Sequence, residues 1–365
     1  MIITISKNNF LRALQTTEKI ISRNLNLPIL NNILLKTDKG RLKLSSTNLE
    51  IGINYWIGSK IKEEGEIAVP SKIITDFIQN IQDEKITLTT RKNTLLINSD
   101  HYKTQILGFE TKDFPIIPEI KEKPVLKIRA QILKNAFLSV VDSTAISETR
   151  IELTGVYTQL GGSGVEFAAT DGFRLAEKSI LYENDQKNEI NSFIIPRSTA
   201  FEIIRILSDL DEDINISLSD NQIKFSGNDF YLISRLIDGQ YPDYKKVIPE
   251  KFISRAVLNR DDFQKQIRLS SIFSSSIFDI KLQVQNDKTI ILAKNQDRGE
   301  INSSISSILK NEPFDVSVNY HYLLDGLKVV NSQKVVLEFT GNGSPLIIKP
   351  EEGKDFLYLI MPLRQ

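Results

Sequence analysis

One pattern recurs three times along the 365 residues, and this internal repeat limits the possible folds more than any other feature. Each unit opens with a short β-branched strand followed by an amphipathic helix. A second helix later follows a strand that ends in a comparable tripeptide. These tripeptides are Val69-Pro70-Ser71, Ile195-Pro196-Arg197 and Val318-Asn319-Tyr320, about 125 residues apart. A period of that length is typical of one domain per unit.

The other landmarks of the repeat agree with this spacing. The opening strands and helices are expected at Ile2–Ile5 and Asn8–Ser22, at Val125–Ile128 and Ala130–Ser143, and at Arg255–Leu258 and Arg260–Phe273. A second landmark recurs at about the same spacing, at Thr47-Asn48-Leu49, Thr170-Asp171-Gly172 and Lys294-Asn295-Gln296. The sequence therefore predicts gene-duplicated domains, although a repeat alone is compatible with many functions.

Short alternating strands fill the rest of each unit, for example Lys85–Thr90, Thr94–Asn98, Ile214–Leu218 and Gln222–Phe225. Two helices and many hairpin-linked strands per unit predict the α+β class, with the helices packed on antiparallel sheets. Proline-containing stretches at Asp113–Pro124 and Gln240–Pro249 are typical of linkers. We therefore expect three domains, over residues 1–121, 122–250 and 251–365.

Composition narrows the function classes. Lys and Arg number 46 and Asp and Glu also number 46, which argues against coating nucleic acid by bulk charge. The chain has no cysteine, which excludes disulfides and thiolate chemistry. The N-terminal sequence lacks the pattern of a signal peptide, and no apolar run is long enough to span a membrane. We expect a soluble, cytoplasmic protein with no membrane partner.

Positive charge is concentrated on the polar faces of several predicted helices. In the first helix, Phe10, Ala13, Leu14 and Thr17 form the core stripe, and the opposite face is cationic. The cations on such faces are Arg12, Lys19 and Arg23, then Arg197 and Arg205, then Arg260, Lys265 and Arg268. Acidic residues gather in loops such as Asp211–Asp213. This segregation suits contact with a nucleic-acid backbone, but each face taken singly is more typical of a solvated helix.

Catalytic and metal-binding patterns are missing. The only histidines, His101 and His321, lie in no metal-binding or triad motif. Gly161–Gly164 lacks the Gly-Lys-Ser/Thr of a phosphate loop and predicts a hairpin turn. Asp209, Asp211 and Asp213 begin like a calcium loop, but Ile214 stands where that loop needs glycine. We therefore expect no enzyme activity, no metal and no cofactor.

Several segments, in order along the whole chain, resemble the bacterial DNA polymerase III beta sliding clamp family. Thr170–Ala176 is similar to the family's TDGHRLA segment, and Asp238–Tyr244 to its G-x-F/Y-P-D-Y segment. Tyr358–Arg364 resembles its terminal VMPMR, while Leu27–Leu35 and Thr47–Glu50 match near the N-terminus. Taken singly, each segment is explained as well by a local turn or strand end, for example Asp171-Gly172 as a hairpin turn.

The resemblance implies a hydrophobic cleft between the second and third domains that captures short linear peptides of the replicative polymerase, the clamp loader and repair proteins. Carried over position by position, the cleft comprises Leu153, Thr170, Gly172, Phe173, Arg174, Leu175, Pro242, Lys246, Val247, Leu359, Met361, Pro362, Leu363 and Arg364. Arg174 and Arg364 are expected to bind polar peptide groups at the rim. Phe173 replaces a frequent histidine and Lys246 a frequent arginine, which puts the peptide preference in doubt.

The resemblance also implies a head-to-tail homodimer that forms a ring of six domains around double-stranded DNA, without sequence specificity. The cationic helix faces named above would line its lumen. The dimer interface would use Lys103, Gln105, Ile106, Leu107, Ile272, Phe273, Ile301, Ser303 and Ile305. Ile272 and Phe273 fit ordinary core packing equally well. The alternative function is a non-enzymatic, repeat-built scaffold or binding protein that does not encircle DNA.

Overall fold

Short strands with alternating burial make up most of the computed structural model, which describes residues 1–21, 27–161, 164–182 and 191–363. Packing divides the chain into two units, each described separately below. The first unit comprises Met1–Leu133 and Glu202–Leu236, and the second comprises Lys134–Phe201 and Ile237–Gln365. Helices α3 (Ala130–Val140) and α4 (Arg197–Leu207) contribute residues to both units.

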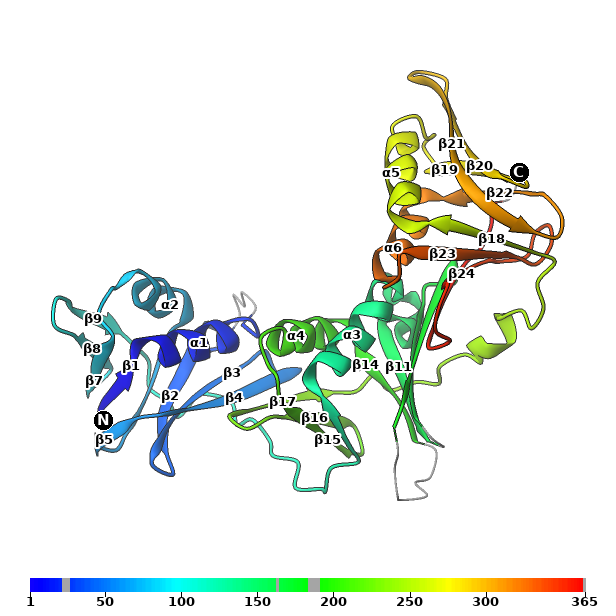
Figure 1. The fold of residues 1–365 in the computed structure, drawn as a ribbon. Helices are drawn as coiled ribbons and strands as arrows, with labels where there is room; N and C mark the ends of the chain where they lie inside the picture. Colours follow the sequence, from blue (N-terminus) through cyan, green and yellow to red (C-terminus); the bar gives the residue numbers. More distant parts are fainter. Residues whose placement is uncertain (22–26, 162–163, 183–190, 364–365) are drawn as a thin grey trace. The chain divides into compact units, whose positions relative to one another are not determined.

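The first unit contains two antiparallel sheets and the helices α1 (Lys7–Glu18) and α2 (Ser71–Asn80) (Figure 1). The smaller sheet has the order β5-β1-β7-β8-β9, and the larger one β10-β15-β16-β17-β4-β3-β2-β6. The strands are β1 (Ile2–Ser6), β2 (Asn32–Asp38), β3 (Arg41–Thr47), β4 (Ile51–Gly58), β5 (Lys60–Glu63), β6 (Glu66–Pro70), β7 (Lys85–Arg91), β8 (Thr94–Asn98), β9 (Lys103–Leu107), β10 (Leu126–Arg129), β15 (Asp213–Ser219), β16 (Gln222–Ser226) and β17 (Phe230–Arg235).

The second unit contains one sheet of twelve strands and the helices α5 (Arg260–Ser271) and α6 (Tyr320–Val329). The strand order is β14-β11-β12-β13-β25-β24-β23-β18-β21-β20-β19-β22. The strands are β11 (Gly155–Gly161), β12 (Gly164–Thr170), β13 (Arg174–Leu181), β14 (Asn191–Pro196), β18 (Ser254–Asn259), β19 (Asp279–Val284), β20 (Lys288–Asn295), β21 (Gly299–Lys310), β22 (Phe314–Asn319), β23 (Lys334–Phe339), β24 (Leu346–Pro350) and β25 (Phe356–Ile360).

The first two repeats make the same hydrogen bonds at matching positions. In the turn after β3, the Thr47 hydroxyl donates to the Ile51 carbonyl at 2.8 Å and the Asn48 side chain accepts from the Ile51 amide at 2.7 Å. In the turn after β12, Thr170 and Asp171 make the same two bonds to Arg174, at 2.6 and 3.0 Å. Leu49 and Gly172 occupy the same position and have φ values of 77° and 90°.

The predicted helices are confirmed, but three ends differ, the third being α5, which ends at Ser271 instead of Phe273. Helix α1 ends at Glu18 instead of Ser22, which itself lies outside the described residues. The amides of Ile20 and Ile21 bond to Thr17 and Glu18 in a tighter turn, so the apolar stripe continues after the α-helix has ended. In the same way α3 ends at Val140, and a 3₁₀ turn covers Val141–Ser143. Hydrophobic periodicity does not distinguish these two kinds of turn.

Candidate functional site

Two repeats meet in each unit through one pair of antiparallel strands. We call the pairing of β4 with β17 in the first unit the first joint, and that of β13 with β25 in the second unit the second joint. At the second joint the Met361 amide donates to the Phe173 carbonyl at 2.8 Å. This bond brings the predicted segments Thr170–Arg174 and Met361–Leu363 side by side, as the cleft prediction requires.

The turn before β13 presents Phe173 to solvent. The Asp171 carboxylate accepts hydrogen bonds from the amides of Phe173 and Arg174, at 2.9 and 3.0 Å. Gly172 takes the left-handed conformation that lets the chain reverse between them. As a result the Phe173 ring is 62% exposed, an unusual state for an aromatic side chain and one typical of a contact surface.

Arg174 lies beneath this surface and holds its parts together. Its side chain is only 10% exposed, and its guanidinium pairs with Asp171 at 2.9 Å and also with Asp325. The ring of Tyr322 lies 4.6 Å from the guanidinium carbon, within cation–π range. Burial lowers the pKa of Arg174, but interactions with Tyr358 and the two carboxylates outweigh burial and raise it above its ordinary value.

These contacts correct the expectation that Arg174 stands at the rim for peptide binding. Its Nε and Nη1 groups donate to Asp171 and Asp325, so the side chain connects the Thr170–Arg174 turn to helix α6. The sequence analysis missed Tyr322 and Asp325. Their i, i+3 spacing after the Val318-Asn319-Tyr320 landmark was the available signal, because it places both on one face of α6.

An apolar layer forms the floor of the site. Leu153, Leu175 and Leu359 are almost fully buried and pack with Tyr241 and Tyr244. The Tyr241 hydroxyl accepts a hydrogen bond from the Thr170 amide at 3.1 Å, which ties the connecting segment to the turn. Burial raises the pKa of Tyr241, so the hydroxyl stays protonated near neutral pH. These three leucines therefore support the surface from below.

The exposed part of the predicted cleft is apolar at its centre and charged at one side. Val247 is 52% and Met361 37% exposed, and Pro242, Pro362 and Leu363 are half-buried. Lys246 is exposed and pairs with Asp243 at 3.0 Å. All predicted cleft residues except Arg364 are described and belong to the second unit; Arg364 lies outside the described residues.

The predicted lumen cations fall into two groups. Arg12, Lys19, Lys265 and Arg268 are exposed. Arg197 and Arg260 are half-buried, and their guanidinium groups donate to the carbonyls of Thr144 and Val330. Arg205, Arg260 and Lys265 also have acidic neighbours, at 3.0 Å (Glu202), 2.8 Å (Asp261) and 3.8 Å (Asp262). Only the first group, with Arg205, is placed for solvent-side contacts, and Arg23 lies outside the described residues.

The two strands predicted for the dimer interface each have one side without a described partner. Strand β9 is the last strand of its sheet. Strand β21 pairs with β18 only through Ser307–Lys310, so Gly299–Ser306 pairs on one side alone, with β20 (Figure 1). Ile106 is buried and Leu107 exposed on β9, while Ile301, Ser303 and Ile305 are half-buried on β21. Ile272 is exposed and Phe273 half-buried after α5.

Within the described ranges, no group of three or more histidines, aspartates and glutamates is arranged to hold a metal ion. No helix found in those ranges has the length and apolar character needed to cross a membrane.

Comparison with known proteins identifies the family. Models of the DNA polymerase III beta subunit match at residues 1–118 (N-terminal domain), 127–243 (central domain) and 245–364 (C-terminal domain). The chain belongs to the DNA polymerase III beta subunit family. The beta sliding clamp of Rickettsia bellii is 31% identical, and that of Staphylococcus epidermidis 28%; the alignments cover 99% of this chain and 99% and 98% of the relatives.

Solved sliding clamps share the whole fold. A clamp of Pseudomonas aeruginosa is 25% identical, with a TM-score of 0.94 over all of both chains, and a second structure of this clamp is bound to griselimycin. The Bacillus subtilis clamp, 24% identical, has the same fold with a TM-score of 0.94. The chain is thus a sliding clamp of three clamp domains with mixed α+β structure, as its sequence predicts.

Proposed function

We propose that two copies of this clamp join head to tail in a ring around duplex DNA, and that the surface at the second joint captures short peptides of partner proteins. We also propose the domain boundaries of the sequence analysis, 1–121, 122–250 and 251–365. The observation that supports the ring is the way in which successive repeats are joined by paired strands. Repeat 1 joins repeat 2 through β4 and β17, and repeat 2 joins repeat 3 through β13 and β25.

The repeat supplies a third pair of strands for the same kind of joint. Strand β21 is the counterpart of β4 and β13, and β9 is the counterpart of β17 and β25. Exposed strand edges favour pairing with another chain. If β21 of one copy pairs with β9 of another, every repeat is followed by an equivalent joint. Such heterologous contacts form a closed ring when the rotation between successive copies brings the last copy back to the first. A dimer then closes a ring of six repeats.

The matching positions also give the register of this third joint. Leu175 pairs with Leu359 and Gly52 with Ile233, and their counterparts are Glu300 and Gln105. The register therefore places Glu300 opposite Gln105 and Ile301 opposite Thr104. Ile301 and Thr104 are both half-buried, and Glu300 and Gln105 are both exposed, so each pair faces the same side of the joined sheet.

A closed ring stays on DNA by topology and needs no strong contacts. Arg12, Lys19, Arg205, Lys265 and Arg268 would face the phosphates, and few, water-softened contacts of this kind permit sliding. The clamp is proposed to act in the cytoplasm as a non-catalytic processivity factor. The clamp loader, which opens the ring, the replicative polymerase and repair proteins are its proposed partners.

Retention on DNA tests the ring. Clamp loaded by its loader onto nicked circular plasmid should co-elute with the plasmid in gel filtration and be lost when one restriction cut linearises it. A ring slides off a free DNA end, whereas a scaffold that only binds the surface of DNA stays bound equally to circular and linear plasmid. Equal retention would support the alternative function of a scaffold without encirclement.

Peptide binding tests the cleft separately. A labelled peptide of the family's QLxLF type should bind saturably, and Phe173→Ala should weaken binding about tenfold, or about 1.4 kcal/mol, because the exposed ring is a contact anchor. Leu181→Ala is the matched control, since Leu181 is an exposed apolar residue at the far end of the same strand. Equal affinity of the Phe173 variant and wild type would refute the assignment.

A further inference from the structure

One sheet face in each of the three repeats carries an equivalent row of four residues, each row crossing four neighbouring strands. In repeat 2 the row is Ile194, Tyr157, Ala168 and Glu177. In repeat 1 it is Ala68, Leu34, Ser45 and Asn54. In repeat 3 it is Ser317, Lys281, Leu292 and Asn302. The strand registers alone define this equivalence.

A connecting segment covers the row in repeats 1 and 2. In repeat 2, Tyr241 and Tyr244 pack on Ala168 and Ile194, and Tyr241 stacks on Tyr157 with ring centroids 4.9 Å apart. In repeat 1, Phe114, Pro115, Ile116 and Ile117 border the same small pocket as Leu34, Ser45 and Asn54. Both segments therefore place an aromatic residue followed by proline over the sheet: Phe114-Pro115 and Tyr241-Pro242.

The chain enters this position in the same way in all three repeats. The Phe109 amide donates to the Ala68 carbonyl at 2.8 Å, and the Ile237 amide to the Ile194 carbonyl at 2.9 Å. The Leu363 amide donates to the Ser317 carbonyl at 2.8 Å. These three bonds are equivalent, so Leu363 stands where each connecting segment begins to cross its row.

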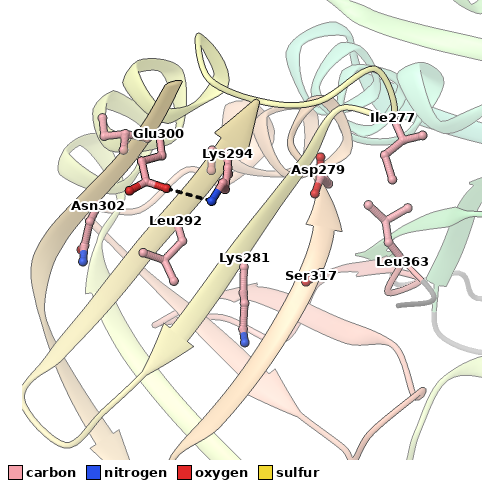
Figure 2. A pocket seen from close by; sticks show the side chains of 11 residues that line it. Ile277, Asp279, Lys281, Leu292, Lys294, Glu300, Asn302, Ser317 and Leu363 are labelled. Carbon is pink, nitrogen blue, oxygen red and sulfur yellow. Dashed lines mark ion pairs between the residues drawn. The ribbon is translucent and has the colours of Figure 1, made fainter. Parts of the chain in front are cut away.

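In repeat 3, no described segment lies over the row, and the position is a trough of about 730 Å³. Figure 2 shows its lining. All four row residues border it, with Ile277 and Leu363 at one end and Lys294 and Glu300 at the other. Ile277 is largely exposed, and Leu292 and Leu363 are half-buried, so the trough leaves apolar surface in contact with water.

We propose that this trough is a docking site for an extended segment of a partner protein that carries an aromatic residue followed by proline. The occupant is inferred from the two covered copies of the site, each filled by that chemistry. Proline keeps the preceding residue extended, as a segment lying flat on a sheet requires. Lys281 stands where Tyr157 stacks on Tyr241. Its ammonium group pairs with Asp315 at 2.9 Å and would meet the partner's ring by a cation–π contact beside this ion pair.

Of the predicted cleft residues, Leu363 is the one that also borders the trough. The cleft surface is centred on Phe173, Val247 and Met361, whereas the trough lies on the solvent face of strands β19 to β22. Leu363 borders the trough and lies two residues from Met361, so the trough and the cleft are adjacent along this segment. A single partner could therefore occupy both.

The probe is a synthetic peptide with the sequence of residues 238–249, titrated into the full chain with labelled isoleucine and leucine methyl groups and followed by NMR. We expect saturable shifts of the Ile277 and Leu292 methyls, which lie outside the predicted cleft, with a Kd near about 1 mM for so short a segment. Replacing both tyrosines of the peptide with alanine should abolish the shifts. Leu292→Glu should weaken binding at least about tenfold, because it places a charge against the aromatic contact.

Ile290→Glu is the matched control, since Ile290 lies on the same strand and face but does not border the trough. Should Leu292→Glu fail to fold by thermal unfolding, Lys281→Ala replaces it, with the same expected direction. The proposal is overturned if the trough methyls do not shift, if Ile290→Glu weakens binding equally, or if Met361→Ala abolishes the shifts. Since none of these outcomes involves DNA retention or the QLxLF-type peptide, they separate this site from the proposed ring and cleft.

Discussion

The register of the third joint can be tested by a disulfide between two copies. The chain contains no cysteine, so each introduced thiol is unique. At the second joint Phe173 and Met361 form a hydrogen-bonded pair, since the Met361 amide donates to the Phe173 carbonyl at 2.8 Å. Hydrogen-bonded and non-hydrogen-bonded pairs alternate along an antiparallel ladder. Counting along the equivalent positions makes Thr104 and Ile301 a non-hydrogen-bonded pair.

The distances decide the expected result. The Cα atoms of a non-hydrogen-bonded pair lie about 4.5 Å apart with their side chains close, within the range of about 4.4–6.8 Å that a disulfide spans. The variant Thr104→Cys, Ile301→Cys should therefore oxidise to a dimer linked at both seams. On a non-reducing denaturing gel it should move from 41.5 kDa to about 83 kDa, while each single variant stays monomeric.

A one-residue slip provides the control. In the variant Gln105→Cys, Ile301→Cys the Cα atoms would be about 6 Å apart and the side chains would point to opposite faces of the sheet. This variant should cross-link poorly under the same mild oxidation. Equal yields from the two double variants would mean that the ladder has another register. No linked dimer from either one would refute strand pairing between copies at this joint.

Three further predictions concern the folded chain. Gly172→Ala should lower the free energy of unfolding by about 1 kcal/mol, whereas Leu49→Gly at the equivalent left-handed position should not lower it, as measured by urea denaturation. Arg174→Ala should cost about 2 kcal/mol in the same assay, because it leaves the half-buried carboxylates of Asp171 and Asp325 without their buried partner. The hydrogen bond to Asp83 raises the pKa of His101, so the stabilisation is complete below pH 6.5 and is lost as the pH rises through the folded-state pKa. His101→Gln should remove this pH dependence of the unfolding midpoint, and an unchanged pH profile would contradict it.

The repeat and the secondary structure could be read from the sequence because their signals are local. The three tripeptide landmarks each end a strand and begin a helix in the structure, at Pro70, Pro196 and Asn319. The hairpin turn predicted at Asp171-Gly172 follows β12, and the two matching landmarks lie at the ends of β3 and β20. Alternating burial and turn chemistry repeat within a few residues, so a single sequence carries enough information to place them.

The role of Arg174 could not be read in the same way, because it depends on long-range contacts. Its partner Asp325 is 151 residues distant in sequence and becomes a neighbour only when β25 pairs with β13. A segment match gives the identity of such a residue but not its exposure. The same limit hid the covering of the sheets by Phe114 and Tyr241, since the linkers were recognised by composition and not by what they cover.

Comparison of the joints explains why the peptide surface is expected at the second joint and not at the first. The first joint has the same turn. It also has the equivalent of the bond from the Met361 amide to the Phe173 carbonyl, since the Arg235 amide donates to the Glu50 carbonyl at 3.0 Å. At the position of Phe173, however, it carries Glu50, and at the position of Met361 it carries Arg235. An aromatic ring and a thioether favour an apolar peptide, and the latter adapts to several partners. The two opposite, solvent-exposed charges of Glu50 and Arg235 do not favour binding of an apolar peptide.

The same backbone thus serves two purposes according to a few exposed side chains. The strand pairing that builds a joint depends on backbone hydrogen bonds, which any residues at these positions can supply. Peptide capture depends on the side chains that the pairing leaves exposed, and these differ between repeats. Exchanging Phe173 for glutamate and Met361 for arginine should therefore abolish peptide binding while leaving the β13·β25 pairing and the unfolding free energy within about 0.5 kcal/mol of wild type. Loss of folding would show that these side chains also stabilise the joint.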